Sequence, residues 1–115
     1  MKPATFAPAY CALYPKLAEI TRSHGYALAA HGSMERDFDL ICIPWTEQPS
    51  TPDEVVAAIV SKLSIRLIVD PKKDGDNGAQ RKPHGRVAYT LSIGFGQCAA
   101  DLSFMPISPG KGGAT

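Results

Sequence analysis

Hydrophobic residues recur at helical spacing in an early stretch of the chain. The residues that set this spacing are Tyr10, Leu13, Leu17 and Ile20. Such three- and four-residue steps place apolar side chains on one helix face. Ser23-His24-Gly25 is a typical end for this helix, because glycine adopts the left-handed conformation just past the last turn. Pro15 interrupts the pattern, so either the helix begins near it or two short helices meet there.

A second helix is predicted from start signals at Thr51. Thr51 can cap the first turn, Pro52 suits the first helical position, and Glu54 supplies an acid at the third. One apolar face follows through about Ser64, made of Val55, Val56, Ile59, Val60 and Leu63.

Two short apolar runs, Tyr26–His31 and Phe38–Pro44, have the composition of strands. Only about six residues separate them, which favours a hairpin. Ile65–Val69 is a run rich in β-branched residues and predicts a third strand.

The last part of the chain predicts a second hairpin. Arg86–Ile93 alternates between polar and apolar residues, Gly94–Gln97 can turn the chain, and Cys98–Met105 follows as the partner strand. Asp101 faces away from the apolar side of its strand, beside Ser103. The order is helix, hairpin, helix, strand and hairpin, which predicts an α+β fold with a small mixed or antiparallel sheet and helices packed on one side.

Length and composition set the scale of the protein. A chain of 115 residues with 44% hydrophobic and 20% charged residues is typical of one globular domain. We expect this domain over residues 1–107 and a flexible tail over residues 108–115, where Pro109 and three glycines occur. No stretch has the pattern of a signal peptide or a membrane span, so we expect a cytoplasmic protein without a membrane partner.

The cysteines and the charges narrow the function classes. Cys11, Cys42 and Cys98 are far apart in apolar surroundings, which predicts reduced, buried thiols rather than zinc ligands or disulfides. A net charge of +1 argues against a nucleic-acid binder held by bulk electrostatics. Acidic residues gather in the segment 35–54 and basic residues in the segment 72–86. These segments would hold a metal and a polyphosphate between them, or they are two solvated loops of opposite sign.

Candidate chemistry is concentrated where His31-Gly32-Ser33 is followed by Asp37-Phe38-Asp39. Asp37 and Asp39 leave the same face of a strand, because one residue separates them. Such a pair persists in apolar surroundings mainly when a cation bridges it, and hard oxygen ligands suit Mg²⁺ or Mn²⁺. The Gly-Ser turn offers N–H groups and a hydroxyl to a phosphate. The alternative is a solvated strand start with Arg36 as the ion-pair partner.

This arrangement resembles the motif of the polymerase-beta-like nucleotidyltransferase superfamily. In that family a Gly-Ser precedes an Asp-x-Asp on the next strand, and a third carboxylate lies on a later strand. The matching residues are Gly32-Ser33, Asp37-Phe38-Asp39 and Asp101. The resemblance covers roughly Leu17 to Met105, and minimal nucleotidyltransferases and short phage-encoded members are nearest in size.

The sequence also departs from the family pattern in two places. Only Met34–Arg36 separate Ser33 from the first aspartate, where relatives usually have a longer segment. The helical substrate-binding region that many relatives carry after the third carboxylate is not found in this sequence. A second subunit of a homo-oligomer, or another partner, would supply a missing acceptor site.

The resemblance implies an enzyme that moves a nucleoside monophosphate from a nucleoside triphosphate to a hydroxyl acceptor on a protein, a nucleic acid or a small molecule. Asp37, Asp39 and Asp101 would be the catalytic residues and the ligands of Mg²⁺ or Mn²⁺, with Asp101 also helping to deprotonate the attacking hydroxyl. Gly32 and Ser33 would hold the β- and γ-phosphates.

A basic segment precedes the strand that should neighbour Asp101. Its candidate residues, which would clamp phosphates or carry the acceptor, are Arg81, Lys82, His84 and Arg86. An ordinary solvated loop is the alternative. Trp45 and Tyr89 would stack on a base, or they would pack in the core or on the surface of the protein.

Other functions fit the sequence less well or belong to another class. A catalytically inactive module that binds a nucleotide or a host protein is the main alternative. A two-histidine phosphoesterase needs two His-x-Ser/Thr units, and only His31-Gly32-Ser33 qualifies. A nuclease pattern exists in Pro52-Asp53 and Asp70-Pro71-Lys72, but Pro71 would interrupt the strand that presents the lysine.

Overall fold

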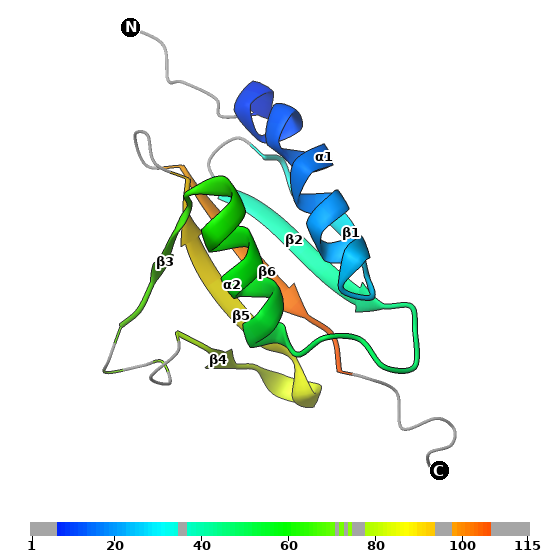
Figure 1. Ribbon diagram of the computed structural model, residues 1–115. Coiled ribbons are helices and arrows are strands. Elements are labelled where there is room, and N and C mark those ends of the chain that lie inside the picture. The colour runs from blue at the N-terminus through cyan, green and yellow to red at the C-terminus, as the bar shows by residue number, and fades with distance from the viewer. Residues whose placement is uncertain are drawn as a thin grey trace, which may run out of the picture.

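The computed structural model describes residues 7–34, 37–70, 72, 74, 78–93 and 98–106. Two helices lie on one face of a six-stranded mixed sheet (Figure 1), which confirms the predicted α+β class. The elements in chain order are α1 (Ala7–Ser23), β1 (Tyr26–His31), β2 (Asp37–Pro44), α2 (Pro52–Leu63), β3 (Arg66–Ile68), β4 (Gln80–Arg81), the 3₁₀ turn η1 (Pro83–Gly85), β5 (Val87–Ser92) and β6 (Ala99–Phe104).

Helix α1 runs without a break through Pro15. The expectation that a helix begins at Pro15, or that two helices meet there, is therefore wrong. A proline inside a helix costs about 3 kcal/mol because it removes one backbone hydrogen bond. Tyr10 on one side of Pro15 and Leu17 and Ile20 on the other are all buried, and each such side chain contributes roughly 1.5–3 kcal/mol. Burial on both sides of the proline outweighs its cost.

Helix α2 begins as the sequence predicts. The Thr51 hydroxyl accepts a hydrogen bond from the Glu54 backbone N–H at 3.2 Å, and the Glu54 carboxylate accepts one from the Thr51 N–H at 2.8 Å. This reciprocal pair satisfies two backbone donors that the first turn of a helix leaves without partners. Val55, Val56 and Ile59 then face the core.

The strand order in the sheet is β1-β2-β6-β5-β3, and β4 pairs with β5. Both predicted hairpins are present, since β1 is antiparallel to β2 and β5 is antiparallel to β6. The two hairpins join through β2 and β6, which run parallel. This central pairing places the segment around Asp39 beside the segment around Asp101.

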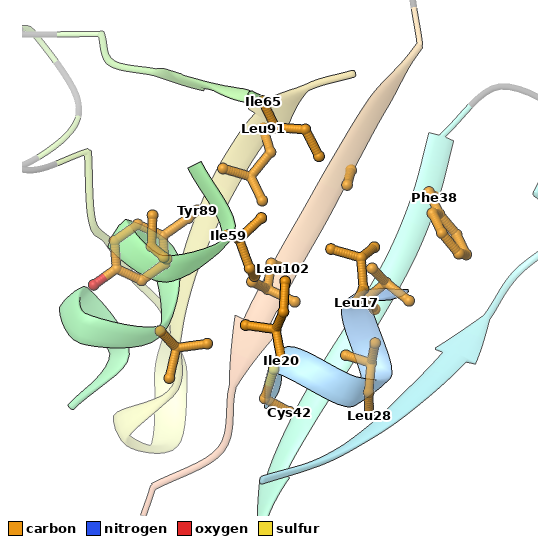
Figure 2. Packing of buried hydrophobic residues seen from close by; sticks show 14 of the residues in the cluster. Leu17, Ile20, Leu28, Phe38, Cys42, Ile59, Ile65, Tyr89, Leu91 and Leu102 are labelled. Carbon is orange, nitrogen blue, oxygen red and sulfur yellow. The ribbon is translucent and has the colours of Figure 1, made fainter. Parts of the chain in front are cut away.

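The core lies between the helices and one face of the sheet (Figure 2). Tyr10 of α1 stacks on Phe38 of β2 with ring centroids 4.6 Å apart. The opposite face, which neither helix covers, carries Asp39 and Asp101; we call it the open face.

The cysteines only partly follow the prediction. All three are free thiols, but Cys11 is exposed on α1, while Cys42 and Cys98 are buried. The expectation of a buried thiol at Cys11 is wrong, because Cys11 lines an open cavity between α1 and the start of β2 and is therefore exposed. Within the described residues, no helix is long and apolar enough to cross a membrane. The tail expected at residues 108–115 lies outside the described residues.

Candidate functional site

One row of side chains crosses the open face of the sheet. The strand register pairs His31 with Asp39, Asp39 with Asp101, and Asp101 with Thr90. Partners in register on neighbouring strands project from the same face of a sheet and lie side by side. We call these four residues, from strands β1, β2, β6 and β5, the carboxylate row. Two aspartates far apart in sequence thus become direct neighbours.

Asp37 belongs to the same face but not to the same row. It pairs with Ala99, two residues before Asp101. Asp37 therefore lies one pleat further along β2, with its Cα about 7 Å from that of Asp39. Asp37 and Asp101 are exposed, and Asp39 is half-buried. Within the described residues, no three His, Cys, Asp or Glu side chains converge as they stand into a group that could hold a metal ion.

The charges around Asp101 form one electrostatic cluster. Partial burial against the sheet raises the pKa of the Asp101 carboxyl, and the nearby Asp39 carboxylate raises it further. Lys82 and Arg86 act in the opposite direction, and Asp37 adds a small increase to the pKa. Asp101 still has solvent contact, so water screens these charges in part. The cluster unites the three candidate aspartates with two of the four candidate basic residues.

The Gly32 turn comes close to the carboxylate row. Gly32 has φ +82°, and a Cβ added there would lie 3.1 Å from the Oδ2 atom of Asp39. A larger residue would be strained by its backbone conformation and crowded by the carboxylate. Glycine therefore allows the backbone to approach Asp39, with Ser33 exposed directly after it.

The segment Arg81–Arg86, which we call the basic loop, approaches the open face from the β5 side, opposite the Gly32 turn. Its ends are joined where the Lys82 backbone N–H donates to the Arg86 carbonyl oxygen at 2.8 Å. His84 and Gly85 complete the tight turn with left-handed φ values of 67° and 79°. The Arg86 Nη1 atom donates to the Ser103 Oγ at 2.9 Å, which fixes the guanidinium beside the strand that carries Asp101.

Arg81 and His84 are placed differently from Lys82 and Arg86. Arg81 pairs with Val87, so it alternates to the helix-covered side. There its charge lowers the pKa of Tyr89, although burial and the hydrogen bond to Asp53 raise that pKa more. His84 is exposed on the turn. Arg36, the alternative ion-pair partner for the aspartates, lies outside the described residues.

Two residues of the site were not singled out as functional by sequence reasoning. Thr90 adjoins Asp101 only through the register of β5 and β6. Ser103 is 4% exposed and holds Arg86. A sequence signal existed for Ser103, because it shares a strand face with Asp101. No local pattern could have shown its contact with Arg86.

The aromatic residues considered for base stacking lie elsewhere. Trp45 follows the end of β2, at the opposite end of the strand from Asp37, and is 61% exposed. Tyr89 is buried and packs edge-to-face on Phe104 with ring centroids 5.7 Å apart.

Comparison with protein-family models, curated proteins and solved structures found no match to this chain.

Proposed function

We propose that this protein is a metal-dependent nucleotidyltransferase that moves a nucleoside monophosphate from a nucleoside triphosphate to a hydroxyl acceptor. The observation that carries this proposal is the parallel, in-register pairing of Asp39 with Asp101. Two neighbouring carboxylates repel each other, and here the Asp39 carboxylate helps to raise the pKa of Asp101 after burial. Binding a cation or a proton between them relieves this repulsion, so such a pair favours a site that binds one of these.

The donor set fits Mg²⁺ or Mn²⁺ in its chemistry. Asp39 and Asp101 supply hard oxygen ligands on one face, and Asp37 adds a third on the same face. We infer that these three aspartates would hold the ion once their side chains turn toward it, since as they stand they do not converge on one point. When bound, the ion would supply charge stabilisation at the α-phosphate oxygens of the nucleoside monophosphate being transferred.

The protein's own residues would carry the other steps of the transfer. Asp101 would accept the proton of the attacking hydroxyl, because its pairing with Thr90 places it beside the cavity proposed for the acceptor. The acceptor oxygen would bond to the α-phosphorus as the bond to the pyrophosphate oxygen breaks, so pyrophosphate leaves. Lys82 and Arg86 would stabilise the negative charge near Asp101, and the turn at Gly32-Ser33 would hold the β- and γ-phosphates.

The acceptor would enter from the side of the row that lies away from Gly32. A cavity of about 380 Å³ opens there, with Thr90, Gln80 and Lys82 among its lining residues. Because Thr90 pairs with Asp101, a hydroxyl bound in this cavity would lie next to the proposed base. We place the activity in the cytoplasm, where free thiols such as those of this chain remain reduced.

Thermal unfolding with and without ligands tests the proposal. We expect Mg²⁺ plus a nucleoside triphosphate to stabilise the wild type by about 2.7 kcal/mol at a hundred times the dissociation constant. The Asp39→Asn variant should lose this stabilisation. Glu47→Gln, the same chemical change at an exposed position outside the row, should keep it.

Label transfer then tests the chemistry itself. Wild-type protein, Mg²⁺ and α-³²P-labelled nucleotide should label a component of a cell extract, and Asp39→Asn should not. If no nucleotide stabilises the wild type at millimolar concentration, the transferase proposal fails. A module that binds a host protein would then be the better explanation.

A further inference from the structure

A cavity of about 280 Å³ lies on the helix side of the sheet, directly behind the Gly32 turn. Its lining residues are Cys11 and Tyr14 of α1, Ala30 of β1, Met34 of the turn and Phe38 of β2. They come from four different segments that meet at the end of β1 and the start of β2.

The same two segments of chain, the turn at Gly32 and the start of β2, contribute residues to the cavity and to the neighbourhood of the carboxylate row. A Cβ added at Gly32 would lie 3.1 Å from the Oδ2 atom of Asp39, and Met34, two residues later in the same turn, lines the cavity. Phe38 stands between Asp37 and Asp39 and faces the opposite side of the strand. Among the described residues, the start of β2 alone therefore separates the cavity from the candidate metal ligands. A ligand with an anionic end and a flat apolar end could reach both sides of this edge.

The chemistry of the cavity favours a flat, uncharged group. None of its described lining residues is charged, and aliphatic, aromatic and sulfur-containing side chains form its walls. The Tyr14 hydroxyl already donates to the Leu28 carbonyl oxygen. The cavity thus offers apolar surface and little side-chain hydrogen bonding for a ligand.

We propose that this cavity holds the base of the nucleoside triphosphate whose phosphates lie at Gly32-Ser33. This inference rests on the proposed transferase function and adds to it a base site and a specificity. Binding by apolar contact accepts any base, because every base has a flat π-face, and it favours the larger ring system. We expect purine nucleotides to bind several-fold more tightly than pyrimidine nucleotides, with less than about threefold difference between adenine and guanine.

Cys11 provides a natural reporter for the cavity. It is exposed and lines the cavity, whereas Cys42 and Cys98 are buried and serve as internal controls. The rate at which Ellman's reagent modifies Cys11 is measured in the full chain and assigned by mass spectrometry. ATP or GTP with Mg²⁺ should slow this modification by about tenfold at saturation, as expected when the thiol is covered. Inorganic tripolyphosphate with Mg²⁺ should leave the rate unchanged, because it has no base.

A cavity-filling variant tests the same site independently. Ala30→Phe should weaken ATP binding at least tenfold while the thermal shift with tripolyphosphate and Mg²⁺ stays as in the wild type. Ala29→Phe is the matched control, because Ala29 is also exposed on β1 but projects to the open face. It should leave ATP binding unchanged.

The outcomes separate the base site from the proposed function. If ATP stabilises the wild type through Asp39 but neither protects Cys11 nor responds to Ala30→Phe, the base site is refuted and the transferase proposal stands. Equal protection by tripolyphosphate also refutes the base site. Slow modification of Cys11 in the free protein would mean that another part of the chain fills the cavity, and this too would overturn the inference. Failure of every nucleotide to stabilise the wild type would overturn both proposals.

Discussion

Replacing Asp39 by asparagine should stabilise the metal-free protein, although most substitutions in a sheet destabilise it. The reason is the register that places Asp39 beside Asp101. Neighbouring strands lie about 4.8 Å apart, so we take the two charges to be about 5 Å apart. Their repulsion is then about 0.8 kcal/mol in water and about 3 kcal/mol at an effective dielectric constant of 20.

Solvent exposure decides which end of this range applies. Asp101 is exposed and Asp39 is half-buried, so water screens much of the repulsion. We expect Asp39→Asn to raise the free energy of unfolding by about 1 kcal/mol near neutral pH. Asp37→Asn is the control, because Asp37 has the smallest influence on the pKa of Asp101. Its effect should be well under half as large.

The pH dependence of this stabilisation has a defined sign. The pKa of Asp101 in the folded chain lies above its usual value of 3.8, so the folded chain holds this proton more tightly than the unfolded chain does. Stability therefore falls as pH rises from the usual pKa through the raised one, and it stays reduced above it. Asp39→Asn should relieve part of this penalty at neutral pH and none well below the usual pKa of 3.8, where the Asp101 carboxyl is protonated in both the folded and the unfolded chain.

Urea unfolding in EDTA, at low and high salt, measures the effect. The gain in unfolding free energy should shrink in high salt, because exposed charges are screened. Direct titration of the Asp101 carboxyl by NMR should show a lower pKa in Asp39→Asn than in the wild type. A variant that is less stable than the wild type at neutral pH, with an unchanged Asp101 pKa, would refute the inferred proximity of the two aspartates.

Three further substitutions test the surroundings of the site. Gly32→Ala should cost about 1–2 kcal/mol in urea unfolding, because φ is +82° and the added Cβ would lie 3.1 Å from Asp39 Oδ2; an unchanged stability would show that the turn has another conformation. Ser103→Ala should cost about 1 kcal/mol and raise the NMR-measured pKa of Asp101, because Arg86 loses the hydroxyl that holds it; a lowered pKa would contradict this role. Thr51→Ala should cost about 1 kcal/mol of thermal stability through loss of the α2 cap, and a neutral effect would show that the cap contributes nothing.

Local patterns in the sequence predicted the parts of the fold that depend on neighbours in the chain. The capping residues at Thr51 specified where α2 begins, and strict alternation showed that Asp101 faces away from the apolar side of its strand. Both rules act over a few residues. Pro15 shows their limit, because burial of Tyr10 and Leu17 on either side of it overrides the local preference against a proline.

The candidate site could be predicted from sequence only as a set of residues, not as a geometry. The contact between Asp39 and Asp101 depends on β2 and β6 pairing in parallel and in one register. A shift by one residue would turn one of the aspartates toward the helices. Likewise, the four basic residues of the loop look equivalent in sequence. Only the pairing of Arg81 with Val87 and the hydrogen bond from Arg86 to Ser103 separate them.

The balance of charge in the cluster bears on how ligands would bind. Three aspartates and the cations Lys82 and Arg86 act together there and leave a net charge of −1. A site with so little excess negative charge should bind Mg²⁺ weakly alone, and its aspartates should repel a free triphosphate. A divalent ion would reverse the sign of the cluster and make it attractive to phosphate. Metal and nucleotide should therefore bind cooperatively, and calorimetry should find weaker binding of each alone than of the two together; tight binding of a metal-free nucleotide would contradict this reasoning.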